Sequence, residues 1–371
     1  MADEVAYAAA GIRLAGRAAQ ERAPLLALLE RLELDDCVVV ESAENHVTCV
    51  VRDDVGRAWM PNGDTMGLAS RLNLDPLADP THLEREIVVA MLAGPRVFDF
   101  PSFAELAAAI RIRRNIVGAA RRTRLAFHAG EAERPAEYWT YSPEHGFTIL
   151  PGASLLAALE SATQPADDGT LYRFSCYRAS EYVILLAIAR ELEITNPPLL
   201  AALQRRWQVR PIMSAKFHET FLYEYGSMSD PLPPAYYVPG DRVWFRNPDA
   251  RSSDIAGYEG SWVFYLGGGR FCNFWQPEAT YTLQSKCLEI YHWRHGVFRD
   301  AAGALAMDEA AVEQRVRASL ADAPSVGPIL ARMERLRDAP GIYADGGCID
   351  ASREFPRSVC PGTATIAVAD A

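Results

Sequence analysis

The order of the hydrophobic patterns along the chain restricts its fold more than any other feature. Before Pro239 the longest patterned stretches show helical spacing, whereas after it short apolar runs are separated by Gly and Pro. Runs of that kind are typical of β-strands, and they lie at residues 242–246, 261–266, 270–275 and 287–293. Helices followed by strands predict an α+β layer fold rather than an alternating βαβ fold.

The 371 residues are enough for two domains, or for one domain with extensions. A helix is predicted over residues 5–34, followed by a β-hairpin over 37–51 and a turn-rich linker. A later helix begins near Asp308, and the end of the chain is rich in Gly, Ser, Thr and Ala. We therefore predict an N-terminal extension (1–84), a central domain (85–297), a C-terminal helical extension (298–340) and a flexible tail (341–371).

Composition excludes several classes of protein. The net charge of −11 argues against a general nucleic-acid binder, and no apolar run approaches the roughly 20 residues that span a bilayer. Acidic residues near the start argue against an export signal. The seven cysteines are odd in number and lack paired spacing, which predicts reduced thiols in the cytoplasm and no metal site.

A second helix is predicted over residues 102–122. Ser102 and Glu105 have the spacing of a capping box, in which a hydroxyl and a carboxylate bind N–H groups at a helix start. Apolar residues then recur at helical spacing and leave four arginines on the other side.

Cys176 has the most informative position among the cysteines. An aromatic segment, residues 171–174, leads to Ser175-Cys176, and an apolar helix follows through Leu192. A helix start stabilises a thiolate, so we expect a lowered pKa and a nucleophilic thiol. The alternative is that Cys176 is a small buried apolar residue, as isolated cysteines commonly are.

Several segments resemble the bacillus spore-coat type of protein-glutamine gamma-glutamyltransferase. The similarity covers roughly residues 85–275, with the segments in the same order and at similar spacing. They are FDFPSFAEL (98–106), IRRNIV (112–117), Tyr138-Trp139 with Ser142-Pro143-Glu144, LYRFSC (171–176) and PGDRVWFRNP (239–248). LYRFSC resembles that family's nucleophile motif.

The resemblance implies a papain-like, NlpC-type core in which a helix bearing Cys176 packs on an antiparallel sheet. It also implies acyl transfer from a protein glutamine to a lysine amine through a Cys176 thioester. The partners would be glutamine-donor and lysine-acceptor proteins, with no nucleic acid or membrane involved. This chemistry needs no cofactor and no metal.

The chain departs from the family pattern at the two residues that assist the cysteine. Ser261 occupies the family's Glu position, and Phe274 occupies its His position. Glu259 is a candidate substitute, because a bulge at Gly260 would bring its carboxylate towards the thiol. The alternative for Glu259 is an ordinary surface carboxylate in a turn-rich segment.

Two further kinds of side chain are candidate partners of the thiol. Asn273 can orient a catalytic group, as amides do in other cysteine enzymes. A histidine is the commonest partner of a catalytic thiol, and His218, His292 and His295 lie in or near the predicted sheet.

Two other functions remain open. A cysteine hydrolase or deamidase of the same fold would resolve the thioester with water. A catalytically impaired binding protein would agree with the residues found at 261 and 274.

Overall fold

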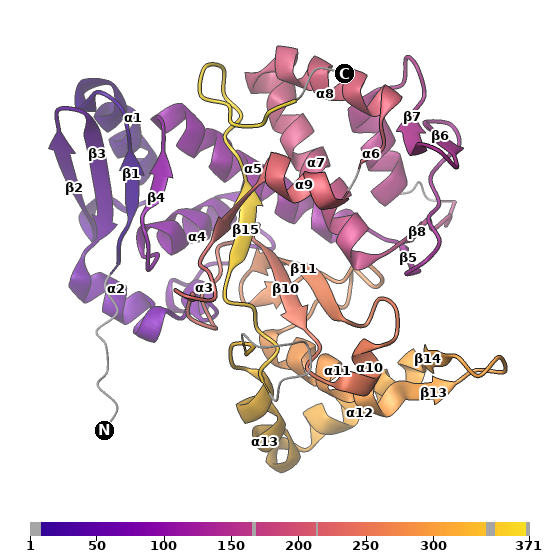
Figure 1. The fold of residues 1–371 in the computed structure, drawn as a ribbon. Helices are drawn as coiled ribbons and strands as arrows, with labels where there is room; N and C mark the ends of the chain where they lie inside the picture. Colours follow the sequence, from indigo (N-terminus) through magenta and orange to yellow (C-terminus); the bar gives the residue numbers. More distant parts are fainter. Residues whose placement is uncertain (1–8, 165–167, 213, 339–345, 369–371) are drawn as a thin grey trace.

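The computed structural model describes residues 9–164, 168–212, 214–338 and 346–368. Three parts lie side by side in Figure 1: a small N-terminal sheet, a group of helices, and a larger sheet with helices below it. The predicted α+β class is confirmed.

The N-terminal part is a four-stranded sheet in the order β2-β3-β1-β4. Residues 12–14 were expected to be helical, but they pair with β3 and β4, and the helix begins only at Ala18. Burial explains the difference, because Ile12 and Leu14 point into the core while Arg13 points out. The elements are β1 (Ile12–Leu14), α1 (Ala18–Arg31), β2 (Val38–Ala43), β3 (His46–Val51), α2 (Asp53–Trp59), α3 (Leu68–Arg71), α4 (Pro80–Leu92) and β4 (Phe98–Phe100).

The helical part is built around the packed pair α5 (Phe103–Arg122) and α7 (Cys176–Thr195). The predicted start of α5 is confirmed, since the Ser102 hydroxyl accepts the Glu105 N–H at 3.3 Å. Smaller elements surround this pair: β5 (Ala126–Phe127), β6 (Trp139–Ser142), β7 (Gly146–Ile149), α6 (Leu155–Thr163), β8 (Arg173–Phe174), α8 (Pro197–Val209) and α9 (Ser214–Phe221).

The larger sheet has five antiparallel strands in the order β12-β11-β10-β15-β9. Both α5 and α7 pack against β11, so the helix that begins at Cys176 lies on an antiparallel sheet, as predicted. The strands are β9 (Leu222–Tyr225), β10 (Arg242–Arg246), β11 (Gly260–Gly267), β12 (Arg270–Phe271) and β15 (Arg353–Pro356).

The C-terminal segment is not the flexible tail that composition predicted. Within the described residues 346–368, β15 lies between β10 and β9 inside the sheet. Glu105 holds the chain that follows β15, because its buried carboxylate accepts the backbone N–H groups of Val359 and Cys360. Hydrogen bonds and burial therefore order a segment whose composition alone suggested disorder.

The predicted strand over 287–293 is also wrong, because these residues belong to α11 (Leu283–Gly296). Thr282 and Ser285 form a reciprocal capping box at its start. Cys287 and Ile290 are buried three residues apart, which is helical spacing. The remaining elements are α10 (Ala250–Ser253), β13 (Val297–Arg299), β14 (Leu305–Met307), α12 (Glu309–Ala321) and α13 (Ala323–Met333).

A buried ion pair fixes α5 to the turn before β10. Arg113 Nη1 lies 2.7 Å from Asp241 Oδ1, and both side chains are almost fully buried. Gly240 has φ +88°, and a Cβ there would lie 2.9 Å from the Arg113 backbone. Only glycine adopts that conformation without strain and leaves that space, which explains the Pro-Gly-Asp sequence of the turn.

We expect Asp241→Asn to lower the free energy of unfolding by about 3–5 kcal/mol, because it leaves the Arg113 charge buried without a partner. Urea denaturation followed by circular dichroism measures the change. Asp99→Asn is the matched control, since it breaks the exposed Arg13–Asp99 pair and should cost less than about 1 kcal/mol. Equal losses in the two variants would contradict the structural role of the buried pair.

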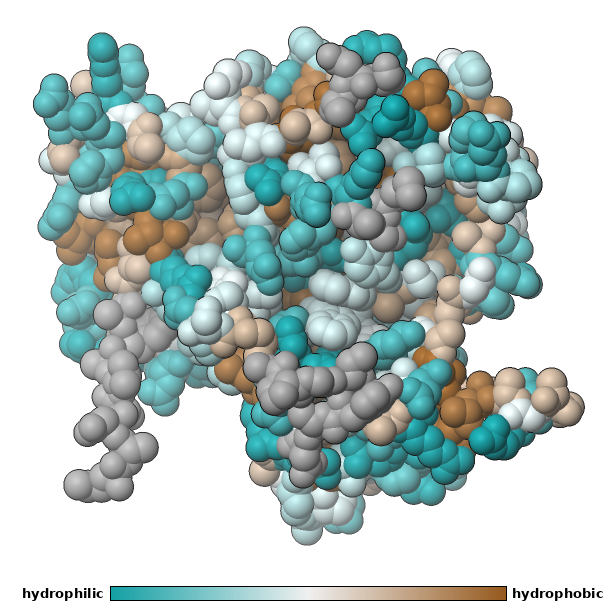
Figure 2. Space-filling view, in the orientation of Figure 1, coloured by the Kyte–Doolittle hydropathy of each residue, from teal (hydrophilic) through white to brown (hydrophobic). Residues whose placement is uncertain are grey.

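The face of the molecule in Figure 2 is mainly hydrophilic, with hydrophobic patches over the N-terminal sheet and near the β13–β14 hairpin. No helix among the described residues has the length and hydropathy needed to cross a membrane.

Candidate active site

Cys176 is the first residue of α7, as predicted from the sequence. The Ser175 hydroxyl caps the helix by accepting the Arg178 N–H at 3.3 Å. The preceding strand β8 pairs in parallel with β5, and Phe174 is buried. These contacts fix the direction in which the chain enters the helix, and with it the position of the thiol.

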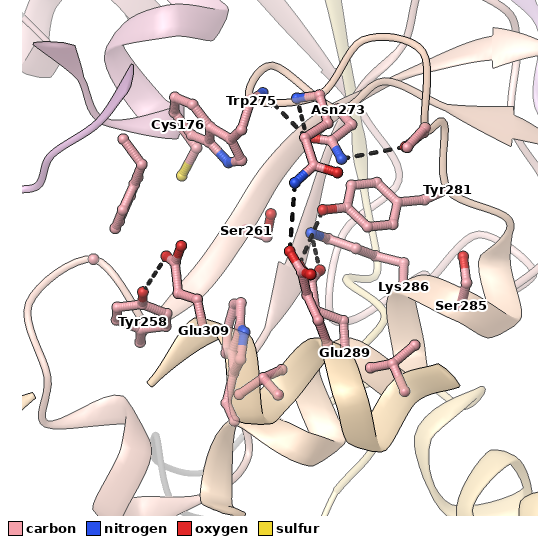
Figure 3. A pocket seen from close by; sticks show the side chains of 18 of the residues that line it. Cys176, Tyr258, Ser261, Asn273, Trp275, Tyr281, Ser285, Lys286, Glu289 and Glu309 are labelled. Atoms are coloured by element: carbon pink, nitrogen blue, oxygen red, sulfur yellow. Dashed lines mark hydrogen bonds and ion pairs between the residues drawn. The ribbon is translucent and has the colours of Figure 1, made fainter. Parts of the chain in front are cut away.

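The thiol opens onto a cavity of about 280 Å³ between β11, α11 and α12 (Figure 3). The wall combines aromatic rings with carboxylate, ammonium and hydroxyl groups. The lining includes Phe127, Cys176, Tyr258, Ser261, Asn273, Trp275, Gln276, Tyr281, Lys286, Glu289, Trp293, Glu309 and Glu313. A thiol in an aromatic-walled cavity is suited to chemistry that must be shielded from water.

The expected lowering of the Cys176 pKa is wrong. Burial raises the pKa of the thiol, and this outweighs hydrogen bonds from the backbone N–H groups of Trp262 and Tyr177 and the charges of Lys286 and Arg242. Packing against the sheet removes water from the sulfur, a cost that sequence position alone does not reveal. Near neutral pH the thiol therefore needs a nearby base to take its proton.

The Arg242 guanidinium packs against the side chains of the two residues whose backbone N–H groups bond to the sulfur. This fully buried group lies 3.9 Å from the centre of the Trp262 ring and 4.5 Å from that of Tyr177. It donates to the Ser180 hydroxyl of α7 at 2.9 Å and to the Glu354 carboxylate of β15 at 2.7 Å. The C-terminal strand is thus joined through one arginine to the helix that carries the thiol.

Glu309, the first residue of α12, places a carboxylate in the same cavity as the thiol. Figure 3 shows this carboxylate on the side of the cavity that faces the Cys176 sulfur. The Tyr258 hydroxyl donates to Glu309 Oε1 at 2.6 Å, which leaves the second oxygen for other partners. Burial and this hydrogen bond raise the Tyr258 pKa, so the phenol stays protonated and holds the carboxylate in place.

Sequence reasoning missed Glu309. It lies in the predicted C-terminal extension, beyond the segments that carry the family resemblance. Asp308 caps α12 as expected, by accepting the Ala311 N–H at 3.0 Å. The only sequence signal was an acidic residue in the first turn of a helix, where carboxylates are common for electrostatic reasons alone.

A second group of charges lies deeper in the cavity. Lys286 is buried, its ammonium pairs with Glu289, and it lies 4.1 Å from the centre of the Tyr281 ring. The Tyr281 hydroxyl donates to the same Glu289 carboxylate at 3.0 Å. The Lys286 charge lowers the pKa of Cys176, although less than burial raises it. This ammonium therefore stabilises negative charge on the sulfur.

The structure does not bring Glu259 to the thiol. Glu259 is exposed, it is absent from the cavity lining, and its carboxylate accepts the Gly257 N–H at 3.0 Å. It precedes β11, whose regular pairing with β10 leaves Gly260 opposite Arg246 without the bulge that the prediction required.

Asn273 does line the cavity, but its amide serves the local backbone. Its Oδ1 accepts the N–H groups of Trp275 and Gln276, and its Nδ2 donates to the Ala279 carbonyl. These bonds hold the turn that carries Trp275, which lines the cavity. Among the described residues, the amide makes no hydrogen bond to a candidate catalytic side chain.

The two positions where the chain departs from the family pattern lie in different surroundings. Ser261 lines the same cavity as the thiol. Phe274 is instead a core residue, only 2% exposed and packed on Phe264.

None of the candidate histidines replaces the family's His, and no histidine of the described residues lines the cavity. His292 contacts Ser319 and His295 outside the cavity lining, and its pKa is lowered to about 4 by burial. His218 pairs with Glu354 at 2.9 Å.

We expect iodoacetamide to modify Cys176 before the six other cysteines, because five of them are buried and Cys37 does not line the cavity that holds Cys176. Because the Cys176 pKa is raised, the rate should grow about tenfold per pH unit from pH 7 to 8.5 as the thiolate fraction rises. Mass-spectrometric peptide mapping after brief treatment measures this. Faster modification of Cys37, or a rate independent of pH, would contradict the assignment.

Comparison with known proteins agrees with the resemblance seen in the sequence. The family model for protein-glutamine gamma-glutamyltransferase matches residues 67–339, a longer span than the predicted central domain, and one that includes α11 and α12. Among solved structures, the transglutaminase from Geobacillus stearothermophilus, without its C-terminal extension, matches at 20% identity with a TM-score of 0.40. The match covers 58% of this chain and 98% of that one. No curated protein sequence matches significantly.

Proposed function

The chain belongs to the protein-glutamine gamma-glutamyltransferase family, and we propose that it transfers the acyl group of a protein glutamine to a lysine amine through a Cys176 thioester. The observation that carries the proposal is the cavity in which the Cys176 thiol faces the Glu309 carboxylate. Glutamine-donor and lysine-acceptor proteins are the proposed partners.

In the first half of the reaction, the Cys176 sulfur attacks the carbonyl carbon of the glutamine carboxamide. The thiol proton passes to Glu309 and then to the leaving nitrogen, which departs as ammonia and leaves a thioester. A general base is required because the raised pKa keeps the thiol protonated near neutral pH. Glu309, rather than Glu259, takes this role in the proposal.

In the second half, a neutral lysine amine attacks the thioester carbonyl. The C–S bond breaks, the amine proton returns through Glu309 to the sulfur, and the product is an isopeptide bond. Trp275, Trp293 and Phe127 line the cavity and would limit the access of water to the thioester. Asn273 acts as a positioning residue, because it holds the turn that carries Trp275.

Simultaneous measurement of two products tests the proposal. The full chain is incubated with casein and a fluorescent primary amine, and both ammonia and labelled casein are quantified. Transfer predicts label on casein together with ammonia. Ammonia without label would assign the protein to the hydrolase or deamidase class, and the absence of both would contradict catalysis on this substrate.

A further inference from the structure

A second cavity, of about 510 Å³, lies on the other side of the start of α7 from the thiol. It is enclosed by α7, α8, α9 and the β6–β7 turn, and it shares no lining residue with the first cavity. Its polar wall is mainly cationic, with the side chains of Arg134, Arg178, Arg206, Arg210 and Lys216.

This concentration of positive charge is unusual in a chain whose net charge is −11. Two carboxylates oppose the five cations. Glu181 is fully buried and pairs with Arg178 at 2.7 Å, and Glu144 lies 3.8 Å from His145 at the exposed rim. Among the described residues, no carboxylate forms an ion pair with any of the other four cations. The cavity therefore carries an excess of about three positive charges, which attracts anions.

Arg134 is the most deeply placed of these cations. It is only 8% exposed, and its guanidinium lies 3.5 Å from the centre of the Phe174 ring and 4.5 Å from that of Tyr182. One nitrogen donates to backbone carbonyls, whereas its Nε is buried and has no hydrogen-bond partner in the described part of the chain. Ring contacts, the Tyr182 hydroxyl and the nearby Glu181 charge offset part of the lost hydration. Burial still lowers the pKa of Arg134, so an anion in the cavity would stabilise its charge.

The remaining wall is mainly aromatic. Phe147, Tyr182, Trp207 and Phe217 line the cavity, and Trp207 is buried in α8. Aromatic rings in a cavity wall suit a planar apolar group. Several guanidinium groups suit an oxyanion that carries more than one negative charge.

We propose that this cavity binds a phosphorylated small molecule, with the phosphate among the four unpaired cations and the organic part against the aromatic wall. A phosphate offers up to two negative charges and three acceptor oxygens, which matches the excess charge of the cavity better than a single carboxylate. The site is separate from the catalytic cavity, so it stands whether or not the proposed acyl transfer is correct. Arg178, two residues after Cys176, donates to the Ile212 carbonyl and so joins the cavity wall to the nucleophile helix.

Isothermal titration of the full chain with phenyl phosphate and with inorganic phosphate tests the site. We expect saturable binding to the wild-type protein and an affinity about tenfold weaker in Arg206→Glu, since a charged hydrogen bond is replaced by repulsion. Arg205→Glu is the matched control. Arg205 is the exposed neighbour in α8, it lies outside the cavity lining, and the substitution changes the net charge equally.

Two arms distinguish the source of the phosphate. Tighter binding of phenyl phosphate than of inorganic phosphate supports the proposal, because the two probes differ only in the ring. Equal affinities would assign the site to free phosphate and overturn the role of the aromatic wall. Absence of binding by both probes, or equal weakening in Arg205→Glu and Arg206→Glu, would overturn the proposal. Arg210→Glu, at an exposed lining position, repeats the test if Arg206→Glu fails to fold.

Discussion

Cys176→Ala should abolish the incorporation of a fluorescent primary amine into casein, with a loss of at least about 10⁴-fold in rate, because no thioester can form. The variant should keep the fold, since the side chain makes no ion pair and alanine is accepted at the first position of a helix. Fluorescence of casein bands after electrophoresis measures the label, and circular dichroism checks the fold.

Cys37→Ala is the matched control, because Cys37 is the other cysteine that is not fully buried. It should label casein at the wild-type rate. Residual labelling by Cys176→Ala at more than a trace would mean that a different nucleophile or an external enzyme carries the reaction.

Glu309→Gln should lower the transfer rate by about 10²–10⁴-fold, the range expected for loss of a general base. Glutamine keeps an oxygen that can accept the Tyr258 hydroxyl, so the variant removes the proton acceptor without removing this contact. The loss should appear in kcat. It should be smaller at high pH, because the thiol with its raised pKa then ionises without help.

Two control substitutions separate this role from a general effect of charge. Glu313→Gln alters a carboxylate one turn further along α12, which bonds to Gln276 at 3.4 Å, and should change the rate by less than about threefold. Glu259→Gln alters the residue that the sequence suggested and should likewise have little effect. A large loss in Glu259→Gln with an active Glu309→Gln would restore the sequence-based hypothesis and remove Glu309 from the mechanism.

The position of Cys176 at a helix start could be predicted because its determinants are local. An aromatic strand, a Ser cap and a long apolar helix lie next to one another around Cys176, and each has a sequence pattern of its own. The capped helix after Ser102 and the Gly240–Asp241 turn before β10 were recognisable for the same reason. Departures from the family pattern at Ser261 and Phe274 were also visible in the sequence, although not their consequences.

The carboxylate that faces the thiol is not local in the sequence and could not be predicted. Glu309 follows Cys176 by more than a hundred residues and reaches the cavity only because α12 packs on α11, which in turn contacts β10. The expected alternative, Glu259, is adjacent to the right strand, but regular pairing between β10 and β11 keeps it outside the cavity. A bulge adds one residue to a strand and turns the neighbouring side chains to the opposite face, so its presence or absence decides which side chains face a site.

By itself, the sequence determined the fold class, the family and the position of Cys176 at a helix start, since these depend on patterns within short segments. Tertiary structure alone decided that residues 353–356 form a strand inside the sheet, that a carboxylate from α12 faces Cys176, and that burial raises the pKa of the thiol. These features depend on which distant segments exclude water from one another, and desolvation is a property of the packed chain rather than of any one segment.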